Sequence, residues 1–309
     1  MRSAFRIRLL SIPGLGGVVP AGIAVILWSL APVLATLARH VPPLQLTALC
    51  VAVAAATTWP VARFTGTRAT DRIAVPRRIW LSAPVLIIGA IGFYFLALRL
   101  APPAEAALVT YTWPVLFVIS AELAYARRVR PPSITGAALA FGGAGLVLMP
   151  SGGAGPGVPW SGYAAAFASG SSWAMFSLLA RRQSVPLTGI MPRLFGLAAA
   201  WAAAGHLLLE TALWPVPPDM ALTIVLIGAG PYGLAFLAWD TALRRGRSTT
   251  VGTLAYAVPV LSAVLLVATG MAAADWRLPT AAFAVVGGCI VASCPERPRR
   301  PASEAARTS

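Results

Sequence analysis

The sequence predicts an all-α membrane protein of ten transmembrane helices, arranged as two inverted repeats of five helices each. Three observations lead to this fold class: the apolarity of the chain, the sidedness of its arginines and an internal repeat. Hydrophobic residues make up 58% of the 309 residues and charged residues only 11%, whereas a soluble domain carries roughly 25% charged residues. Because so few charges cannot keep a globular surface hydrated, the composition excludes an ordinary soluble enzyme.

Ten apolar segments are long enough, or nearly long enough, to cross a bilayer, which takes about 20 helical residues. They are about twice as long as the strands of a membrane barrel and lack the alternation of such strands. We therefore expect ten helices. They run over residues 16–38, 43–62, 79–98, 103–126, 133–150, 160–180, 189–209, 220–243, 249–271 and 278–294.

The arginines orient the chain in the membrane. The net charge is +15 and all 24 basic residues are arginine. If the first residues lie inside, 20 arginines fall on the inner side and only Arg39, Arg99 and Arg277 on the outer side. Because inner loops are enriched in Lys and Arg, this split predicts an inner-membrane protein with both termini in the cytoplasm. The basicity then reflects topology, and we expect no nucleic-acid partner.

The two halves of the chain repeat at an offset of 145 residues. The matches at this offset include Trp28 with Trp173, Tyr111 with Tyr256, and Pro114 with Pro259. Because five is an odd number of crossings, the second half enters the membrane from the opposite side, as in many transporters. We expect repeats at residues 16–150 and 160–294 and a disordered cytoplasmic tail at 295–309.

These residues resemble the EamA-type repeats of the drug/metabolite transporter superfamily. The resemblance rests on the repeated tryptophan, on the repeated proline and on the run Ala-Leu-Arg, which occurs at 97–99 and 242–244. The runs Tyr-Thr-Trp-Pro at 111–114 and Ala-Trp-Asp at 238–240 are similar to aromatic amino-acid exporters of the YddG type. The resemblance implies a transporter of small molecules and, within the family, an exporter of aromatic and other bulky neutral amino acids.

Aromatic residues and prolines fall near the middle of several predicted helices, at the depth where transporters bind substrate. Flat rings stack on apolar groups, and a proline frees a backbone carbonyl one turn earlier. Space filling is the alternative explanation for the rings. No Asp, Glu, Lys or His lies near a helix midpoint, which favours a neutral or zwitterionic substrate. The candidate substrate-binding residues are Trp28, Tyr94, Tyr111, Trp113, Pro114, Trp173, Tyr232, Tyr256 and Pro259.

Three charged residues lie deeper in the predicted helices than the loops do, towards the inner side. They are Glu122, Arg193 and Asp240. If they pair when the inner side is closed, they form a cytoplasmic gate. The alternative is that each reaches the membrane surface or pairs locally, as Asp240 can with Arg244 four residues later.

The sequence contains no catalytic constellation and no closely spaced set of metal ligands, so we expect no enzyme activity, no metal and no cofactor. It favours an alternating-access transporter, an exporter, whose partners are a small-molecule substrate and the lipid bilayer. Another cargo, such as a nucleobase, sugar or drug, is left open. A membrane-embedded enzyme or scramblase is a remote alternative. The sequence does not distinguish a monomer from a homodimer.

Overall fold

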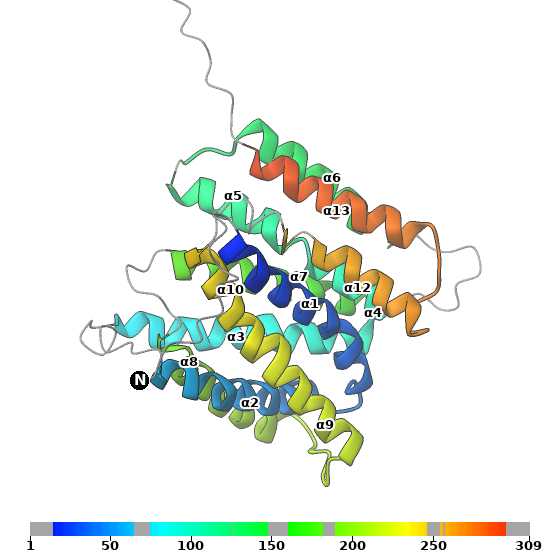
Figure 1. Cartoon of the computed structure of the whole chain (residues 1–309). Coiled ribbons are helices and arrows are strands. Elements are labelled where there is room, and N and C mark those ends of the chain that lie inside the picture. The colour runs from blue at the N-terminus through cyan, green and yellow to red at the C-terminus, as the bar shows by residue number, and fades with distance from the viewer. Residues whose placement is uncertain are drawn as a thin grey trace, which may run out of the picture.

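The structure is a computed structural model that describes residues 15–64, 75–125, 127–147, 160–181, 189–245, 254–255 and 257–294. All regular secondary structure within these ranges is helical, and the helices form one bundle (Figure 1). The expected tail at 295–309 lies outside the described residues.

Five helical segments come from the first half of the chain. The fourth of them is divided, because two non-helical residues separate α4 from α5. The elements are α1 (Leu15–Leu37), α2 (Pro43–Phe64), α3 (Arg77–Leu100), α4 (Pro103–Thr110), α5 (Trp113–Tyr125) and α6 (Pro131–Val147).

Five further segments come from the second half, and here the third of them contains a π-helix, η3. The elements are α7 (Trp160–Arg181), α8 (Met191–Leu209), α9 (Pro218–Ile227), η3 (Gly228–Leu234), α10 (Ala235–Arg245), α12 (Ala257–Ala268) and α13 (Arg277–Ser293). Each of the ten predicted segments therefore contains a helix, which confirms the predicted all-α class with ten spans.

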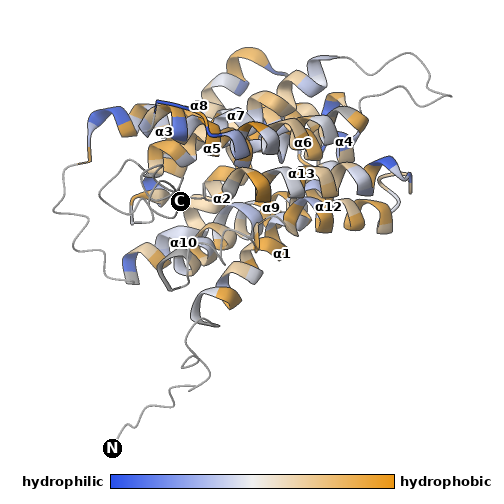
Figure 2. Cartoon of the chain, turned by 90° about the horizontal axis from the view of Figure 1, so that it is seen from above, coloured by the Kyte–Doolittle hydropathy of each residue, from blue (hydrophilic) through white to orange (hydrophobic). Residues whose placement is uncertain are grey.

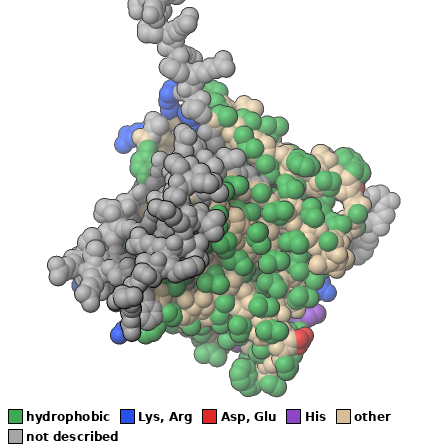
Figure 3. Space-filling view, viewed as in Figure 1, with side chains coloured by type: hydrophobic (Ala, Val, Ile, Leu, Met, Phe, Trp, Pro, Cys, Tyr) green, Lys and Arg blue, Asp and Glu red, His purple; other side chains and the backbone are tan. Residues whose placement is uncertain are grey.

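Length and hydropathy support a membrane location. Among the described residues, six helices are long and apolar enough to cross a bilayer, and α12 and α13 are shorter apolar helices. Apolar side chains predominate on the described part of the face seen in Figure 3, and the hydrophilic residues lie mainly at helix ends (Figure 2). Large side chains such as Leu208 and Phe283 are exposed. A surface of this kind is suited to lipid and not to water.

The helix pairs reflect the repeat. In chain order, the third span packs on the sixth (α3 on α7), and the eighth packs on the first (α10 on α1). The second packs on the seventh (α2 on α8), and the fifth lies beside the tenth (α6 and α13, Figure 1). Exchanging the two halves converts the pair α3 and α7 into the pair α10 and α1. The pair α2 and α8 and the pair α6 and α13 are each converted into themselves. A pseudo-two-fold axis between two five-helix repeats produces this pattern.

Glycine allows α6 and α13 to approach backbone to backbone. A Cβ atom on Gly136 would lie 2.3 Å from the carbonyl oxygen of Gly288, and one on Gly288 would lie 2.4 Å from that of Gly136. Small residues at such a crossing are characteristic of helix contacts in membranes, where close packing replaces the hydrophobic effect.

Candidate substrate-binding site

Two breaks in regular helix border the candidate site. α4 ends at Thr110, and α5 begins at Trp113 with Pro114 as its second residue. Proline has no N–H, so it cannot donate to the carbonyl four residues earlier, that of Thr110. In η3 the chain is wound as a π-helix that contains Pro231. Short π-helical stretches are found frequently at functional sites.

Trp28 of α1 is fixed against the second break. Its indole Nε1 donates a hydrogen bond of 3.0 Å to the carbonyl oxygen of Pro231. Its ring centroid lies 5.2 Å from that of Trp239 and 6.1 Å from that of Phe236, both in α10. The first predicted tryptophan is therefore bound to the interrupted helix of the other repeat.

Trp173 of α7, the repeat equivalent of Trp28, contacts the same phenylalanine. Its ring stacks on Phe236 with centroids 5.4 Å apart and an interplanar angle of 25°. Phe236 thus lies between the two repeated tryptophans, and it also meets Phe195 of α8 edge to face. Sequence reasoning missed Phe236, because its equivalent in the first half is Ile91. Its spacing from Tyr232 and Trp239, four and three residues, is a helical signal that could have identified it.

Three predicted tyrosines gather beside these rings in one hydrophobic cluster. Tyr94 comes from α3, Tyr111 from the junction of α4 and α5, and Tyr232 from η3. Tyr94 and Tyr232 are each 5% exposed. Phe95 lies between them, with its ring 6.3 Å from that of Tyr94 and 6.2 Å from that of Tyr232.

The hydroxyls of these tyrosines differ in their bonding. Tyr111 shares a hydrogen bond of 3.1 Å with the Ser262 hydroxyl of α12, and Ser262 donates in turn to the Ser29 carbonyl of α1 at 3.3 Å. The Tyr94 hydroxyl faces Tyr111 without the geometry of a hydrogen bond. Within the described residues it is the buried side-chain oxygen that lacks a partner.

The remaining predicted residues are placed as follows. Trp113 and Pro114 are half-buried in the first turn of α5, and Pro259 is buried in α12. The ring contacts found among the described residues do not include Trp113. Tyr256 lies outside the described residues. The structure thus gathers Trp28, the three tyrosines and Trp173 around Phe236 and Phe95.

Of the predicted gate residues, Glu122 is the one whose partners the structure describes. The Glu122 carboxylate forms an ion pair with the Arg130 guanidinium and accepts hydrogen bonds from the Arg130 amide at 2.9 Å and the Ser133 hydroxyl at 2.7 Å. Glu122 therefore caps the start of α6, and Arg193 lies exposed on α8. The side chain of Asp240 lies outside the description. A gate made of these three residues stays a prediction.

The same network reaches α13. The Arg130 guanidinium donates hydrogen bonds to the carbonyl oxygens of Cys294 at 3.1 Å and of Ala292 at 3.4 Å. Glu122 and Arg130 thus connect α5, α6 and the end of α13. Sequence reasoning missed Arg130, because its partners on α13 are more than 160 residues away.

The bundle is all-helical and contains helices of membrane length. Its helices pair two-fold across the two halves, and aromatic rings lie at its centre. Together these features define the class of a multi-pass transporter with inverted repeats. Residues 15–149 match the EamA-like transporter family. The chain is 37% identical over 281 residues to the aromatic amino acid exporter YddG of Ancylobacter novellus, covering 87% of this chain and 94% of that protein.

Two further proteins match this chain over most of its length. An uncharacterized protein of Pseudomonas aeruginosa is 28% identical over 219 residues, which is 70% of this chain and 73% of that protein. A solved crystal structure of a protein 34% identical in sequence superposes with a TM-score of 0.70, over 91% of this chain and 97% of that one. The chain belongs to the EamA-like transporter family, as the sequence predicted, and is a multi-pass membrane transporter and not an enzyme.

Proposed function

We propose that the chain exports aromatic and other bulky neutral amino acids across the inner membrane by alternating access, with both termini in the cytoplasm. The observation that carries this proposal is the buried Tyr94 hydroxyl, which lacks a partner in the middle of an aromatic cluster. The likeness to a protein named as an aromatic amino acid exporter supports the same cargo.

The unpartnered hydroxyl is a place for a polar group of the substrate. A buried polar group without a hydrogen bond costs roughly 1–3 kcal/mol. A carboxylate or ammonium group that bonds to the Tyr94 hydroxyl removes this cost when the substrate is bound. The hydroxyls of Tyr111 and Ser262, already paired with each other at 3.1 Å, border the same place and orient the polar end.

The neighbouring rings suit the other end of such a substrate. Phe236 and the two repeated tryptophans offer flat faces from α10, α1 and α7, and Phe95 adds another from α3. Aromatic pairs contribute about 0.5–1.5 kcal/mol beyond the burial of their area. A side chain of phenylalanine, tyrosine or tryptophan therefore gains more here than an aliphatic chain of similar size.

The conformational change of transport is inferred from the distribution of the site residues over the two repeats. The site takes residues from α1, α3 and the junction of α4 and α5 in the first repeat, and from α7, η3, α10 and α12 in the second. Rocking of one repeat against the other would open the cluster first to one side of the membrane and then to the other. In this structure the cluster is closely packed, as the burial of Tyr94 and Tyr232 demonstrates.

Transport of labelled phenylalanine by purified protein in liposomes tests the proposal. Unlabelled compounds are added as competitors, and the transport rate of labelled phenylalanine is measured. They are aromatic and aliphatic amino acids, nucleobases, sugars and cationic drugs. We expect phenylalanine, tyrosine and tryptophan to compete best and nucleobases and sugars to leave the rate unchanged. Competition by nucleobases or sugars, without effect of any amino acid, would assign the chain another cargo of its family.

A further inference from the structure

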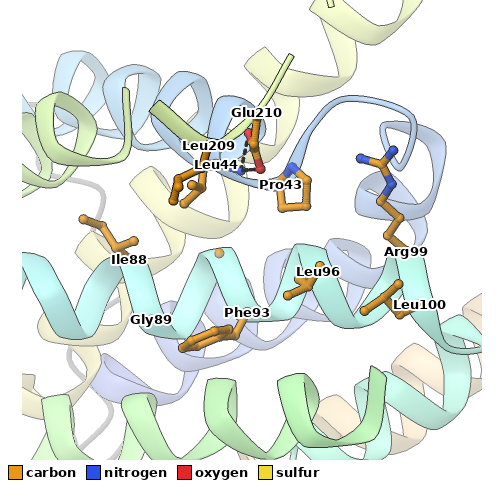
Figure 4. Close-up of a pocket in the computed structure, with 11 residues that line it drawn as sticks. Pro43, Leu44, Ile88, Gly89, Phe93, Leu96, Arg99, Leu100, Leu209 and Glu210 are labelled. Atoms are coloured by element: carbon orange, nitrogen blue, oxygen red, sulfur yellow. Dashed lines mark hydrogen bonds between the residues drawn. The ribbon is translucent and has the colours of Figure 1, made fainter. Parts of the chain in front are cut away.

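A second feature of the molecule lies away from the aromatic cluster. A groove of about 430 Å³ opens between α2, α3 and the end of α8 (Figure 4). None of its lining residues belongs to the candidate substrate-binding site. They are Pro43 and Leu44 of α2, Ile88, Gly89, Gly92, Phe93, Leu96, Arg99 and Leu100 of α3, Leu209 of α8, and Glu210.

The groove opens towards the lipid-facing surface. Phe93 is 43% exposed and Leu209 is 78% exposed, and Leu207 and Leu208 beside it are exposed as well. In a multi-pass membrane protein, large apolar side chains exposed along a helix contact hydrocarbon. The molecules that can enter this groove sideways are therefore those of the bilayer.

One end of the groove is charged. Arg99 lies in the last turn of α3 and is exposed, and Figure 4 shows it beside Leu100 at the end of the groove away from Ile88. In the part of the chain that the structure describes, Arg99 makes no ion pair. Its position at a helix end places its guanidinium at the boundary between hydrocarbon and water.

The acidic residue on the opposite wall is already bonded. The Glu210 carboxylate accepts hydrogen bonds from the backbone amides of Leu44 at 2.9 Å and Gln45 at 3.1 Å, and it pairs with His206 Nδ1 at 2.9 Å. It thereby caps the start of α2. Arg99 is consequently the charged group of the groove that is open to an anion.

An apolar groove that ends at a cation, at the membrane surface, matches the chemistry of one phospholipid. We propose that the groove binds a phospholipid of the surrounding membrane, with an acyl chain along Phe93 and Leu96 and the phosphate on Arg99. A guanidinium binds phosphate oxygens in pairs. Since α3 and α8 come from different repeats, the bound lipid contacts both halves of the transporter.

Native mass spectrometry of the purified full chain tests this proposal. Dioleoyl phosphatidylglycerol is titrated into the detergent, in parallel with dioleoylglycerol, which has the same chains and no phosphate. We expect one phosphatidylglycerol to be retained at concentrations that leave dioleoylglycerol unbound. R99Q should weaken that binding about tenfold, the size of one charge-assisted contact. R39Q, which removes an exposed arginine outside the groove, should leave it unchanged.

A second pair of variants tests the acyl chain. L96W fills the groove and should reduce retention, whereas L81W, an exposed position on the same helix outside the groove, should not. Equal retention of the two lipids, equal effects of R99Q and R39Q, or undiminished retention in L96W would each overturn the proposal. Because the readout is retained lipid, its failure leaves the proposed export untouched, and loss of export leaves this proposal standing.

Discussion

Tyr94 illustrates how a single side chain connects stability with function. Its hydroxyl is buried and unpaired, a state that costs roughly 1–3 kcal/mol. Evolution of a core for stability alone would favour phenylalanine at such a position, because phenylalanine fills the space without a polar group. A tyrosine here is explained by a partner that arrives only with the substrate.

Tyr94→Phe should therefore separate the two properties. We expect the unliganded variant to melt at or slightly above the wild-type temperature, because an unsatisfied group is removed. Transport of phenylalanine at low concentration should fall about tenfold or more, the effect of one lost hydrogen bond to a charged group of the substrate. Thermal unfolding in detergent and transport into liposomes measure the two effects.

Tyr163→Phe is the matched control for this prediction. The Tyr163 hydroxyl donates a hydrogen bond to the Glu105 carboxylate outside the cluster, so its removal should lower the melting temperature and spare substrate selectivity. If Tyr94→Phe instead lowers stability while transport stays at the wild-type rate, the Tyr94 hydroxyl has no role toward substrate.

Phe236 makes the clearest prediction about the rings. It touches both repeated tryptophans and Phe195, and Phe236→Leu removes the flat face that it offers to an aromatic substrate, a ring pair worth about 0.5–1.5 kcal/mol. Affinity for aromatic amino acids should fall about two- to tenfold, measured by competition with labelled phenylalanine. Phe283→Leu, at an exposed position on α13, is the control. A similar effect of both substitutions would contradict a binding role for Phe236.

At the scale of helices, the interruptions and the close crossings decide how the site is built. The sequence predicted single segments at 103–126 and 220–243, and the structure divides both of them. Pro114 accounts for the first break, since it deprives the Thr110 carbonyl of its helical partner. The π-helix η3 packs closely against α2, where a Cβ on Gly228 would meet the Cys50 carbonyl oxygen at 2.5 Å. Residue patterns within one segment do not contain that contact.

The glycine pairs of α6 and α13, at 142–143 and 287–288, occupy equivalent positions in the two repeats. The structure distinguishes the members of each pair. A Cβ on Gly143 would lie 2.5 Å from Ala284, and one on Gly288 would enter the backbone of α6. Gly142 and Gly287, one residue earlier in each repeat, have no atom within 4 Å of such a Cβ. Adjacent residues of a helix point in different directions, so only one of each pair lies in the crossing.

Gly288→Val should separate α6 from α13. We expect a marked loss of thermal stability and folded yield, because overpacking costs typically 1–3 kcal/mol and here meets backbone atoms that cannot move aside. Gly287→Val should stay near the wild-type melting temperature. Size-exclusion profiles and thermal unfolding in detergent compare the two. Equal stability of the two variants would show that the crossing is not as close as described.

At the scale of the whole molecule, sequence reasoning succeeded where the physics is local or periodic. The length and apolarity of ten segments gave the spans, and the fixed offset between residues such as Trp28 and Trp173 gave the repeat. It failed where distant helices meet: Phe236, Ser262 and Arg130 act through contacts that span many helices. The ion pair of Glu122 illustrates the same limit, because the sequence alone did not identify Arg130 at the start of α6 as its partner.

The predicted topology can be tested without reference to the site. The arginine distribution predicts Arg39 outside and Arg128 inside. In a cysteine-free background, a membrane-impermeant maleimide applied to intact cells should label Arg39→Cys and should label Arg128→Cys only after the cells are opened. The reverse pattern would invert the molecule and turn the proposed exporter around.

The central claim is that aromatic substrates bind the rings at the centre of the bundle. The most direct test is transport of labelled phenylalanine by Trp173→Leu and Trp160→Leu proteins in liposomes. Trp173 stacks on Phe236, whereas Trp160 is 75% exposed at the start of α7. We predict that Trp173→Leu slows transport at low phenylalanine concentration about two- to tenfold, while Trp160→Leu transports like the wild type. Equal rates for the two folded variants would contradict the claim.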